Sequence, residues 1–266
     1  MTKPTSAITF LGTGDAATLH SFCTSFVLSG PNHTILFDVG QGVMTLLRIN
    51  GFDVHDIDTI VISHFHPDHI ADIIYFLSRH QEHCYINQIM VPLTIIGPKG
   101  TRDVITRYTD CQVSNDDDPK DGSQPSEIVV RLKKYFKAVP VIELDDNGEE
   151  HTWNSNKIKT FAIEHGQSKG NGYLITMGSN VIGCSGDSNL CPALRDNIKN
   201  AGTWILDCAG IGPKGSDRHA TLTQIIELGN KYPDKTFYCV HRRDWTPPEL
   251  PKNVICPTHG DVFPLF

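Results

Sequence analysis

The sequence lacks several features that would place it in common classes of protein. No apolar run approaches the length of a membrane span, and the stretch MTKPTSAITFLGTG has no basic segment followed by an apolar one. We therefore expect neither a membrane span nor a secretory signal. The chain also lacks an excess of positive charge. Its formal net charge is -7, which provides no electrostatic attraction to nucleic acid or to an anionic membrane.

Cysteine pairs are missing as well. The chain has 8 cysteines, but none forms a CxxC pair and they are scattered over 266 residues. This spacing favours reduced, mostly buried thiols in a cytoplasmic protein.

Strand-like and helix-like stretches alternate along a chain that is long enough for one large domain. Pro67 suits the first turn of a helix, and Thr221 with Gln224 fits a capping box. Short apolar runs bounded by glycine predict strands in 7–14, 23–30, 33–42, 56–66, 86–100, 157–166, 171–188 (a hairpin turning at 178–180), 203–210, 236–241 and 254–263. Helical spacing predicts helices in 43–50, after residue 67, and in 101–109, 131–137 and 221–232. The alternation indicates an α/β fold with two sheets covered by helices.

One segment interrupts this alternation. Residues 114–127, SNDDDPKDGSQPSE, are acidic and rich in residues that break helices and strands. Because strands resume after it with the same spacing, we interpret it as an exposed loop inserted into a single domain of residues 1–266. The four cations of 131–137 lie between acidic segments, which favours the solvated side of a helix over a nucleic-acid patch.

Histidines and aspartates gather where apolar runs end. The stretch ISHFHPDH places His64, His66, Asp68 and His69 within six positions, and three further candidates each follow a short apolar run: His165, Asp187 and His241. Nitrogen and carboxylate ligands without cysteine suit Zn²⁺, Mn²⁺ or Fe²⁺ at an open, catalytic site better than a structural zinc. Seven ligands exceed the need of one tetrahedral ion and suit two.

The local spacing supports two ions. His64 and His66 are two positions apart in an extended segment and therefore share a face, whereas Asp68 and His69 lie past the bend at a helix start. A water between two metals loses a proton near neutral pH and becomes a nucleophile. Taken singly, His165 and His241 also suit ordinary core or surface histidines, and Asp187 also suits a turn or a helix cap.

The chain resembles the metallo-β-lactamase superfamily and, within it, the ribonuclease Z branch. The matching motifs occur in order over almost the whole chain: ITFLGTG, ILFDVGQG, ISHFHPDH, IIGPKGT, SGDS, and the pair RHAT and VHRRD. The resemblance implies an αββα sandwich of two mixed sheets flanked by helices. Its relatives commonly form homodimers, so we expect one here.

The resemblance also implies roles for individual residues. One metal ion would be held by His64, His66 and His165, and the other by Asp68, His69 and His241, with Asp187 bridging the two. Zn²⁺ is the expected metal, with Mn²⁺ or Fe²⁺ as alternatives. Asp68 would also orient the attacking water or accept its proton. His219 in RHAT matches an extra histidine of the branch that stabilises phosphoryl oxygens or protonates the leaving group, and a supporting role at a helix start is the alternative. His259 in PTHGD competes with His241 for the last ligand position and matches less well.

Two departures from the branch concern the substrate. Only 22 positions separate His165 from Asp187, where tRNA-processing members carry a long arm that grips tRNA. The stretch LDCAGIGPKGSD before His219 lacks the usual glutamate of that motif. Together with the acidic net charge, the missing arm makes a long RNA substrate unfavourable.

Relatives without the arm include phosphodiesterases that act on small or cyclic phosphodiesters. The resemblance therefore implies a dinuclear-metal phosphodiesterase for a small phosphodiester, with a cyclic nucleotide as the specific hypothesis by analogy and a metal-bridging hydroxide as the nucleophile. The alternatives are a tRNA 3′-processing endonuclease, a lactone or thioester hydrolase, and a binding or scaffold protein without catalysis. Phe65, Tyr75 and Trp245 are candidates for stacking on a base, and each also suits an ordinary core position.

Overall fold

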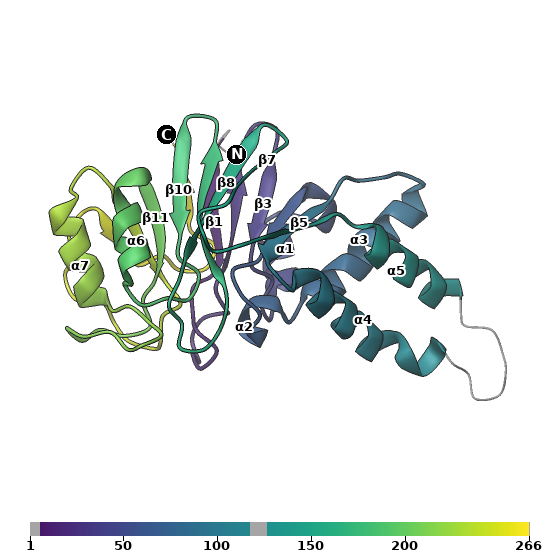
Figure 1. The fold of residues 1–266 in the computed structure, drawn as a ribbon, viewed down its shortest axis with the longest axis horizontal. Helices are drawn as coiled ribbons and strands as arrows, with labels where there is room; N and C mark the ends of the chain where they lie inside the picture. Colours follow the sequence, from purple (N-terminus) through teal and green to yellow (C-terminus); the bar gives the residue numbers. More distant parts are fainter. Residues whose placement is uncertain (1–5, 118–126, 266) are drawn as a thin grey trace.

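The computed structural model describes residues 6–117 and 127–265, without the side chains of 111–117. Two seven-stranded mixed sheets lie face to face (Figure 1). The first contains β1 Ala7–Gly12, β2 Ser25–Ser29, β3 Thr34–Phe37, β4 Thr59–Val61, β5 Thr94–Pro98, β6 Val141–Leu144 and β14 Val262–Pro264, in the order β14-β1-β2-β3-β4-β5-β6. The second contains β7 Glu150–Trp153, β8 Asn156–Ala162, β9 Asn171–Met177, β10 Asn180–Cys184, β11 Thr203–Asp207, β12 Thr236–Val240 and β13 Val254–Ile255, in the order β13-β12-β11-β10-β9-β8-β7.

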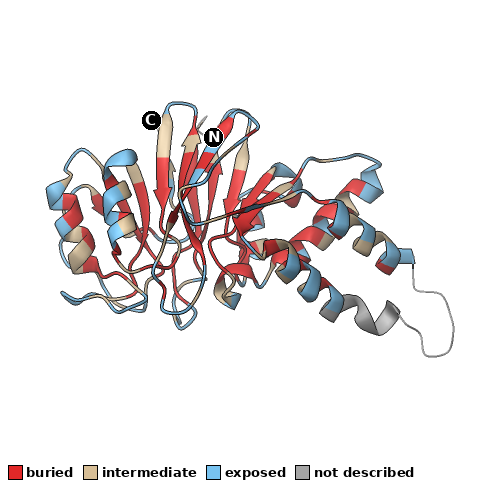
Figure 2. Cartoon of the chain, in the orientation of Figure 1, coloured by how far each residue is buried: buried red, intermediate tan, exposed pale blue. Residues whose placement is uncertain are grey.

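Aromatic side chains fill the space between the sheets. Phe26 and Phe37 stack with ring centroids 4.7 Å apart, and Phe10 lies 5.2 Å from Tyr238 of the other sheet. Successive residues of a strand point to opposite faces, so each sheet directs one apolar face inward. The inner strands are accordingly buried through most of their length (Figure 2), whereas the edge strands β6, β7 and β14 are partly exposed.

Helices cover the outer faces of both sheets. α1 Val43–Ile49, α2 Pro67–Ile70, α3 Ile73–Asn87, α4 Thr101–Asp117 and α5 Glu127–Ala138 follow strands of the first sheet, whereas α6 Pro192–Asn197 and α7 Leu222–Lys231 follow strands of the second. Short 3₁₀ helices occupy Val54–Asp56 and Ile198–Asn200. Figure 1 shows α6 and α7 on one side of the sandwich and α1, α3, α4 and α5 on the other. This arrangement confirms the predicted αββα sandwich.

Several local predictions are confirmed. Pro67 begins α2, and β9 with β10 forms the hairpin that turns at Gly178, whose φ is +61°. The capping box is present: the hydroxyl of Thr221 accepts from the Gln224 backbone N–H, and the Gln224 side chain accepts from the Thr221 N–H. In the described residues no helix combines the length and apolar character required to cross a bilayer.

Other local predictions are wrong at the level of element boundaries. The run 254–263 is not one strand: β13 joins the second sheet and β14 the first, because the chain turns between them through Pro257 and Gly260, with φ +85° at the glycine. The expected strand 86–100 is confined to β5, since α3 extends to Asn87. In the predicted acidic loop, residues 114–117 continue α4, residue 127 begins α5, and 118–126 lie outside the described residues. The helix α6 and the strands β6 and β7 were not predicted.

Candidate metal centre

The seven predicted ligands converge at one edge of the sandwich, where strands end. His64 and His66 lie between β4 and α2, and the first turn of α2 carries Asp68 and His69. His165 follows β8, Asp187 follows β10 and His241 follows β12. Side chains from five separate segments therefore meet, and they do so because strands of both sheets end at the same edge.

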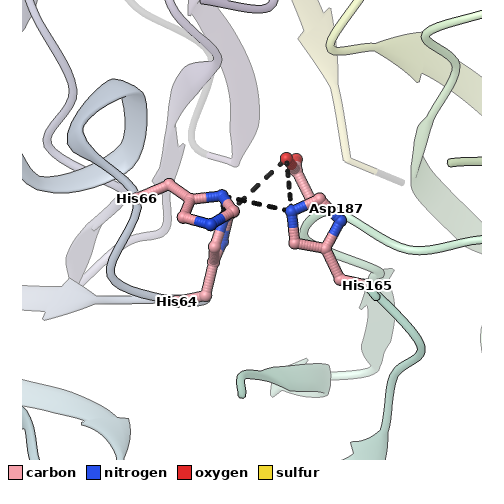
Figure 3. A group of neighbouring side chains, drawn as sticks. All are labelled: His64, His66, His165 and Asp187. Carbon is pink, nitrogen blue, oxygen red and sulfur yellow. Dashed lines mark hydrogen bonds and ion pairs between the residues drawn. The ribbon is translucent and has the colours of Figure 1, made fainter. Parts of the chain in front are cut away.

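The first group of side chains combines three imidazoles and one carboxylate (Figure 3). Nδ1 of His66 lies 3.0 Å from Nε2 of His64 and 3.1 Å from Nε2 of His165. Oδ2 of Asp187 lies 3.7 Å from each of these two Nε2 atoms. Four potential ligand atoms thus surround one point.

The second group shares Asp187 with the first. Nε2 of His241 lies 3.1 Å from Oδ2 of Asp187 and 3.3 Å from Oδ2 of Asp68. Nε2 of His69 lies 3.2 Å from Oδ1 of Asp187 and 3.5 Å from Oδ2 of Asp68. Because Oδ2 of Asp187 lies 3.7 Å from Nε2 of His64 in the first group and 3.1 Å from Nε2 of His241 in the second, this carboxylate has the position of a bridging ligand.

Hydrogen bonds on the far sides of the imidazoles orient several of these rings. The Nδ1–H of His69 donates to Oδ2 of the fully buried Asp38 over 2.7 Å, and the Nδ1–H of His165 donates to the carbonyl of Arg218 over 3.1 Å. Ser168 Oγ lies 2.9 Å from Nε2 of His66. With one nitrogen of each ring occupied in this way, the lone pair of the other nitrogen points into the centre.

Asp38 was missed by the sequence analysis, although the signal was present. It follows β3 in the quoted stretch ILFDVGQG, the same strand-end position that identified Asp187. Its carboxylate also accepts from the backbone N–H and the hydroxyl of Ser63. The positive φ of 57° at Asp38 marks a sharp bend that turns this carboxylate toward the ligands.

For several of the buried ligands, neighbouring charges and burial shift the pKa in opposite directions. Burial alone lowers the pKa of His241, but the carboxylates of Asp187, Asp207 and Asp68 outweigh it and raise the pKa to about 10. Burial raises the pKa of Asp187, but the imidazoles of His241 and His69 lower it more strongly. The pKa of Asp187 therefore lies well below its usual range. Burial together with the neighbouring His69 lowers the pKa of His64 well below its usual value.

The donor atoms fit divalent cations. Among the described side chains, Nε2 of His69 and Oδ1 of Asp187 are buried polar atoms without a hydrogen-bond partner, and such atoms are costly unless something pairs with them. Both face the centre. A set of imidazole nitrogens and carboxylate oxygens without sulfur suits Zn²⁺, Mn²⁺ or Fe²⁺.

His219 lies at the rim of this centre. Its ring stacks on His241 with centroids 5.1 Å apart, and its Nδ1 lies 2.7 Å from Oδ2 of Asp207, a buried residue at the end of β11. Asp207 also accepts from the backbone N–H of Ser188 and Ala209. The sequence analysis noted a missing glutamate before RHAT but did not identify Asp207 as an acidic partner of His219.

The remaining sequence candidates lie elsewhere. His259 is exposed on the turn before β14, against the ring of Phe22, and belongs to none of the potential metal-binding groups. Tyr75 is 58% exposed on α3, and Phe65 packs against the core beneath the helices. Trp245 lies three residues after Arg242, partly buried, on the segment that follows His241.

Comparisons with known proteins agree on the fold. The family model described as anti-Pycsar protein Apyc1 matches residues 6–253. A ribonuclease Z of Clostridium perfringens is 36% identical over 102 residues, which cover 38% of this chain and 31% of that protein. The matched stretch thus spans about a third of the length of this curated relative.

Solved structures resemble nearly the entire chain. The metallo-β-lactamase fold protein YhfI from Bacillus subtilis superposes with a TM-score of 0.73 at 15% identity, over 98% of this chain and 99% of that one. A diphosphatase from the PhnP family superposes with a TM-score of 0.71 at 17% identity, over 97% and 96% of the two chains. At these identities the likeness establishes the metallo-β-lactamase fold.

Proposed function

The chain belongs to the family of anti-Pycsar protein Apyc1, and on this basis we propose that it hydrolyses a 3′,5′-cyclic nucleotide with the help of two divalent metal ions. The family degrades cyclic nucleotides. The observation that supports the proposal most directly is the pair of ligand groups that share Asp187, because two-metal sites suit phosphoryl transfer.

In this proposal His64, His66 and His165 would hold one ion, Asp68, His69 and His241 would hold the other, and Asp187 would be shared. When bound, the ions supply Lewis acidity that polarises the phosphoryl oxygens and lowers the pKa of coordinated water. Zn²⁺ is the expected metal, and Mn²⁺ or Fe²⁺ also match the donor atoms.

The protein's own groups then handle the protons. The attacking water loses a proton to the carboxylate of Asp68, whose side chain is only 11% exposed at the floor of the site. As the bond between phosphorus and the 3′-oxygen breaks, His219 delivers a proton to that oxygen, leaving a nucleoside 5′-monophosphate. The side chain of His219 is 20% exposed and so is open to substrate, and Asp207 orients its ring through Nδ1.

A tRNA 3′-endonuclease is the second candidate because curated ribonuclease Z relatives match the chain. The segment from His165 to Asp187 argues against it, since the β9–β10 hairpin takes up most of the interval in which tRNA-processing members carry an arm. A lactone or thioester hydrolase acts on a carbonyl substrate, which needs no clamp on phosphoryl oxygens, so it would depend less on His219.

The test is a substrate panel with metal content measured on the same sample. Metal-loaded protein is assayed on 3′,5′-cyclic nucleotides, bis-p-nitrophenyl phosphate, a precursor tRNA and a lactone. We expect turnover of cyclic nucleotides that Asp68→Ala and His219→Ala each reduce by about 10²–10⁴-fold. Cleavage of the precursor tRNA at low enzyme, or lactone hydrolysis that survives His219→Ala, would replace the proposal by the corresponding alternative.

Metal analysis tests the non-catalytic alternative, because a scaffold protein would carry much less than one ion per chain. The homodimer and the cytoplasmic location stay predictions. Sedimentation of the metal-loaded protein tests the first, and fractionation of the source cells tests the second.

A further inference from the structure

A cavity of about 450 Å³ lies beside the metal centre. It is bounded by the loop after β1, by the segment that follows His241, and by the turn before β14. Arg242, which lines it, is the next residue after the ligand His241, and the backbone N–H of His241 donates to Thr24 of the neighbouring loop over 2.9 Å. Consecutive Cα atoms are about 3.8 Å apart, so Arg242 of the cavity wall directly adjoins the predicted ligand His241.

The charged groups of the cavity are already paired with the protein. Nε of Arg243 donates to Asp15 over 2.9 Å, and Nη2 of Arg242 donates to the carbonyl of Pro257. Asp244 accepts from the backbone N–H groups of Leu19 and His20. Each of these three charged side chains therefore has a partner within the protein.

The cavity is also lined by the flat rings of His20, Trp245 and His259. Within the described part of the chain, no ring nitrogen of His20 or His259 makes a hydrogen bond, and both residues are exposed. Nε1 of Trp245 donates backward to the carbonyl of Ala209 over 3.4 Å, and the guanidinium carbon of Arg242 lies 5.7 Å from the centroid of its ring. The ring of His259 is supported edge-on by Phe22 at 5.9 Å.

From this arrangement we propose that the cavity receives the nucleobase of the substrate while its phosphodiester lies at the metal centre. The proposal rests on the proposed function and adds the subsite that distinguishes a nucleotide from another small phosphodiester. Aromatic and imidazole rings hold bases by stacking, and a flat heterocycle needs no neutralising charge. His20, Trp245 and His259 are the specificity-determining residues, and of the three aromatic candidates from the sequence only Trp245 lines this cavity.

The first experiment compares two substrates that differ only at the base. KM and kcat are measured on metal-loaded protein with 3′,5′-cyclic AMP and with methyl β-D-ribofuranoside 3′,5′-cyclic phosphate, which carries a methoxy group in place of the base. We expect His20→Ala, His259→Ala and Trp245→Leu each to raise KM for cyclic AMP by about tenfold, the scale of a lost aromatic stack, with kcat within about twofold. KM for the base-free compound should stay unchanged.

Leu19→Ala is the matched control, because Leu19 lies on the same loop, is 84% exposed and does not line the cavity. The two histidine variants keep the test valid if Trp245→Leu fails to fold, since both imidazoles are exposed. Equal effects on the two substrates, or normal KM values in both histidine variants, would overturn the subsite and leave the proposed function intact.

The second experiment separates the subsite from turnover. Trp153 and Trp204 are buried, so Trp245 is the indole that reports a ligand in the cavity. Metal-loaded protein is titrated with AMP and with ribose 5-phosphate while tryptophan fluorescence is followed. We expect saturable quenching by AMP alone, at higher concentrations in His20→Ala and His259→Ala. If AMP alone quenches the fluorescence but the protein hydrolyses no cyclic nucleotide, the subsite is retained and the proposed substrate is rejected. Equal responses to AMP and ribose 5-phosphate would reject the subsite.

Discussion

Oδ2 of Asp207 lies 2.7 Å from Nδ1 of His219, although the two residues come from the end of a buried strand and from an exposed loop. The contact places an ionisable partner behind the one imidazole at the rim of the metal centre that is not a predicted ligand. Nε2 of His219 takes no part in this contact, so in the proposed function the pair would act as a proton donor with a fixed orientation.

The first prediction concerns this pair. Asp207→Asn should lower kcat for a cyclic nucleotide by about 10²-fold, because the imidazole loses the carboxylate that orients it. For bis-p-nitrophenyl phosphate the decrease should be much smaller, since p-nitrophenolate leaves without a proton. Steady-state kinetics on both substrates measures the difference. Equal losses on the two would show that Asp207 supports the fold or the metal ligands instead.

The second prediction concerns Asp38, which accepts from the Nδ1–H of His69. Asp38→Asn should lower the affinity for the ion that Asp68, His69 and His241 would hold by about 10–100-fold. This is the usual effect of losing a carboxylate that is hydrogen-bonded to a ligating histidine. Competition with a chromogenic chelator measures the affinity. Asp58→Asn is the control, because Asp58 accepts from the Thr34 N–H far from the ligands. Unchanged affinity in Asp38→Asn would contradict the assignment of His69.

Metal stoichiometry supplies the third prediction. His66→Ala should remove chiefly one ion, because His66 belongs to one ligand group, whereas Asp187→Ala should reduce both, because Asp187 belongs to each. Elemental analysis after dialysis against a weak chelator gives the ions per chain. If Asp187→Ala retained one tightly held ion, the bridging role would be wrong.

A fourth prediction follows from the packing behind Asp68. A Cβ added to Gly40 would lie 1.8 Å from the backbone oxygen of Asp68, and backbone cannot yield as a flexible side chain can. Gly40→Ala should therefore lower the free energy of unfolding by about 1–3 kcal/mol and weaken metal binding. Gly202→Ala, which meets no atom within 4 Å, should change the free energy by less than about 0.5 kcal/mol. Urea titrations of both variants, with and without metal, test the contrast.

The fifth prediction is a pH dependence away from the metal centre. Burial, reinforced by His83 and His55, lowers the pKa of His80 to about 4, and Nδ1 of His80 accepts from the hydroxyl of Tyr135 at 2.6 Å. An unfolded histidine has a pKa of about 6.5, so the unfolded chain binds more protons between these values and stability falls as pH decreases from about 6.5 to about 4. Urea titrations across this range should show a smaller decrease for His80→Gln than for the wild type. Identical slopes would assign the acid sensitivity to other groups.

Much of the fold follows from local pattern. Short apolar runs ending in glycine correspond to most of the strands, and Thr221 with Gln224 set the start of α7 because a capping box depends on residues three apart. The failures are of another kind. Residues 254–263 read as one strand because both halves are apolar, but the two halves join different sheets, and a partner strand is not visible in local sequence. α6 and the edge strands β6 and β7 are short and weakly patterned, so their formation depends on contacts with neighbouring elements rather than on local sequence.

The candidate site divides along the same line. The sequence by itself determined which residue types are available as ligands, because HFHPDH and the strand-end His165, Asp187 and His241 have a chemistry that few other roles require. Only the tertiary structure decided how these residues are arranged. It places Asp187 between two groups of imidazoles, and it brings Asp38 into contact with His69 and Asp207 into contact with His219. It also gathers His20, Trp245 and His259 around one cavity. These relations join residues far apart in the chain, and their distances depend on the packing of two sheets rather than on spacing along the sequence.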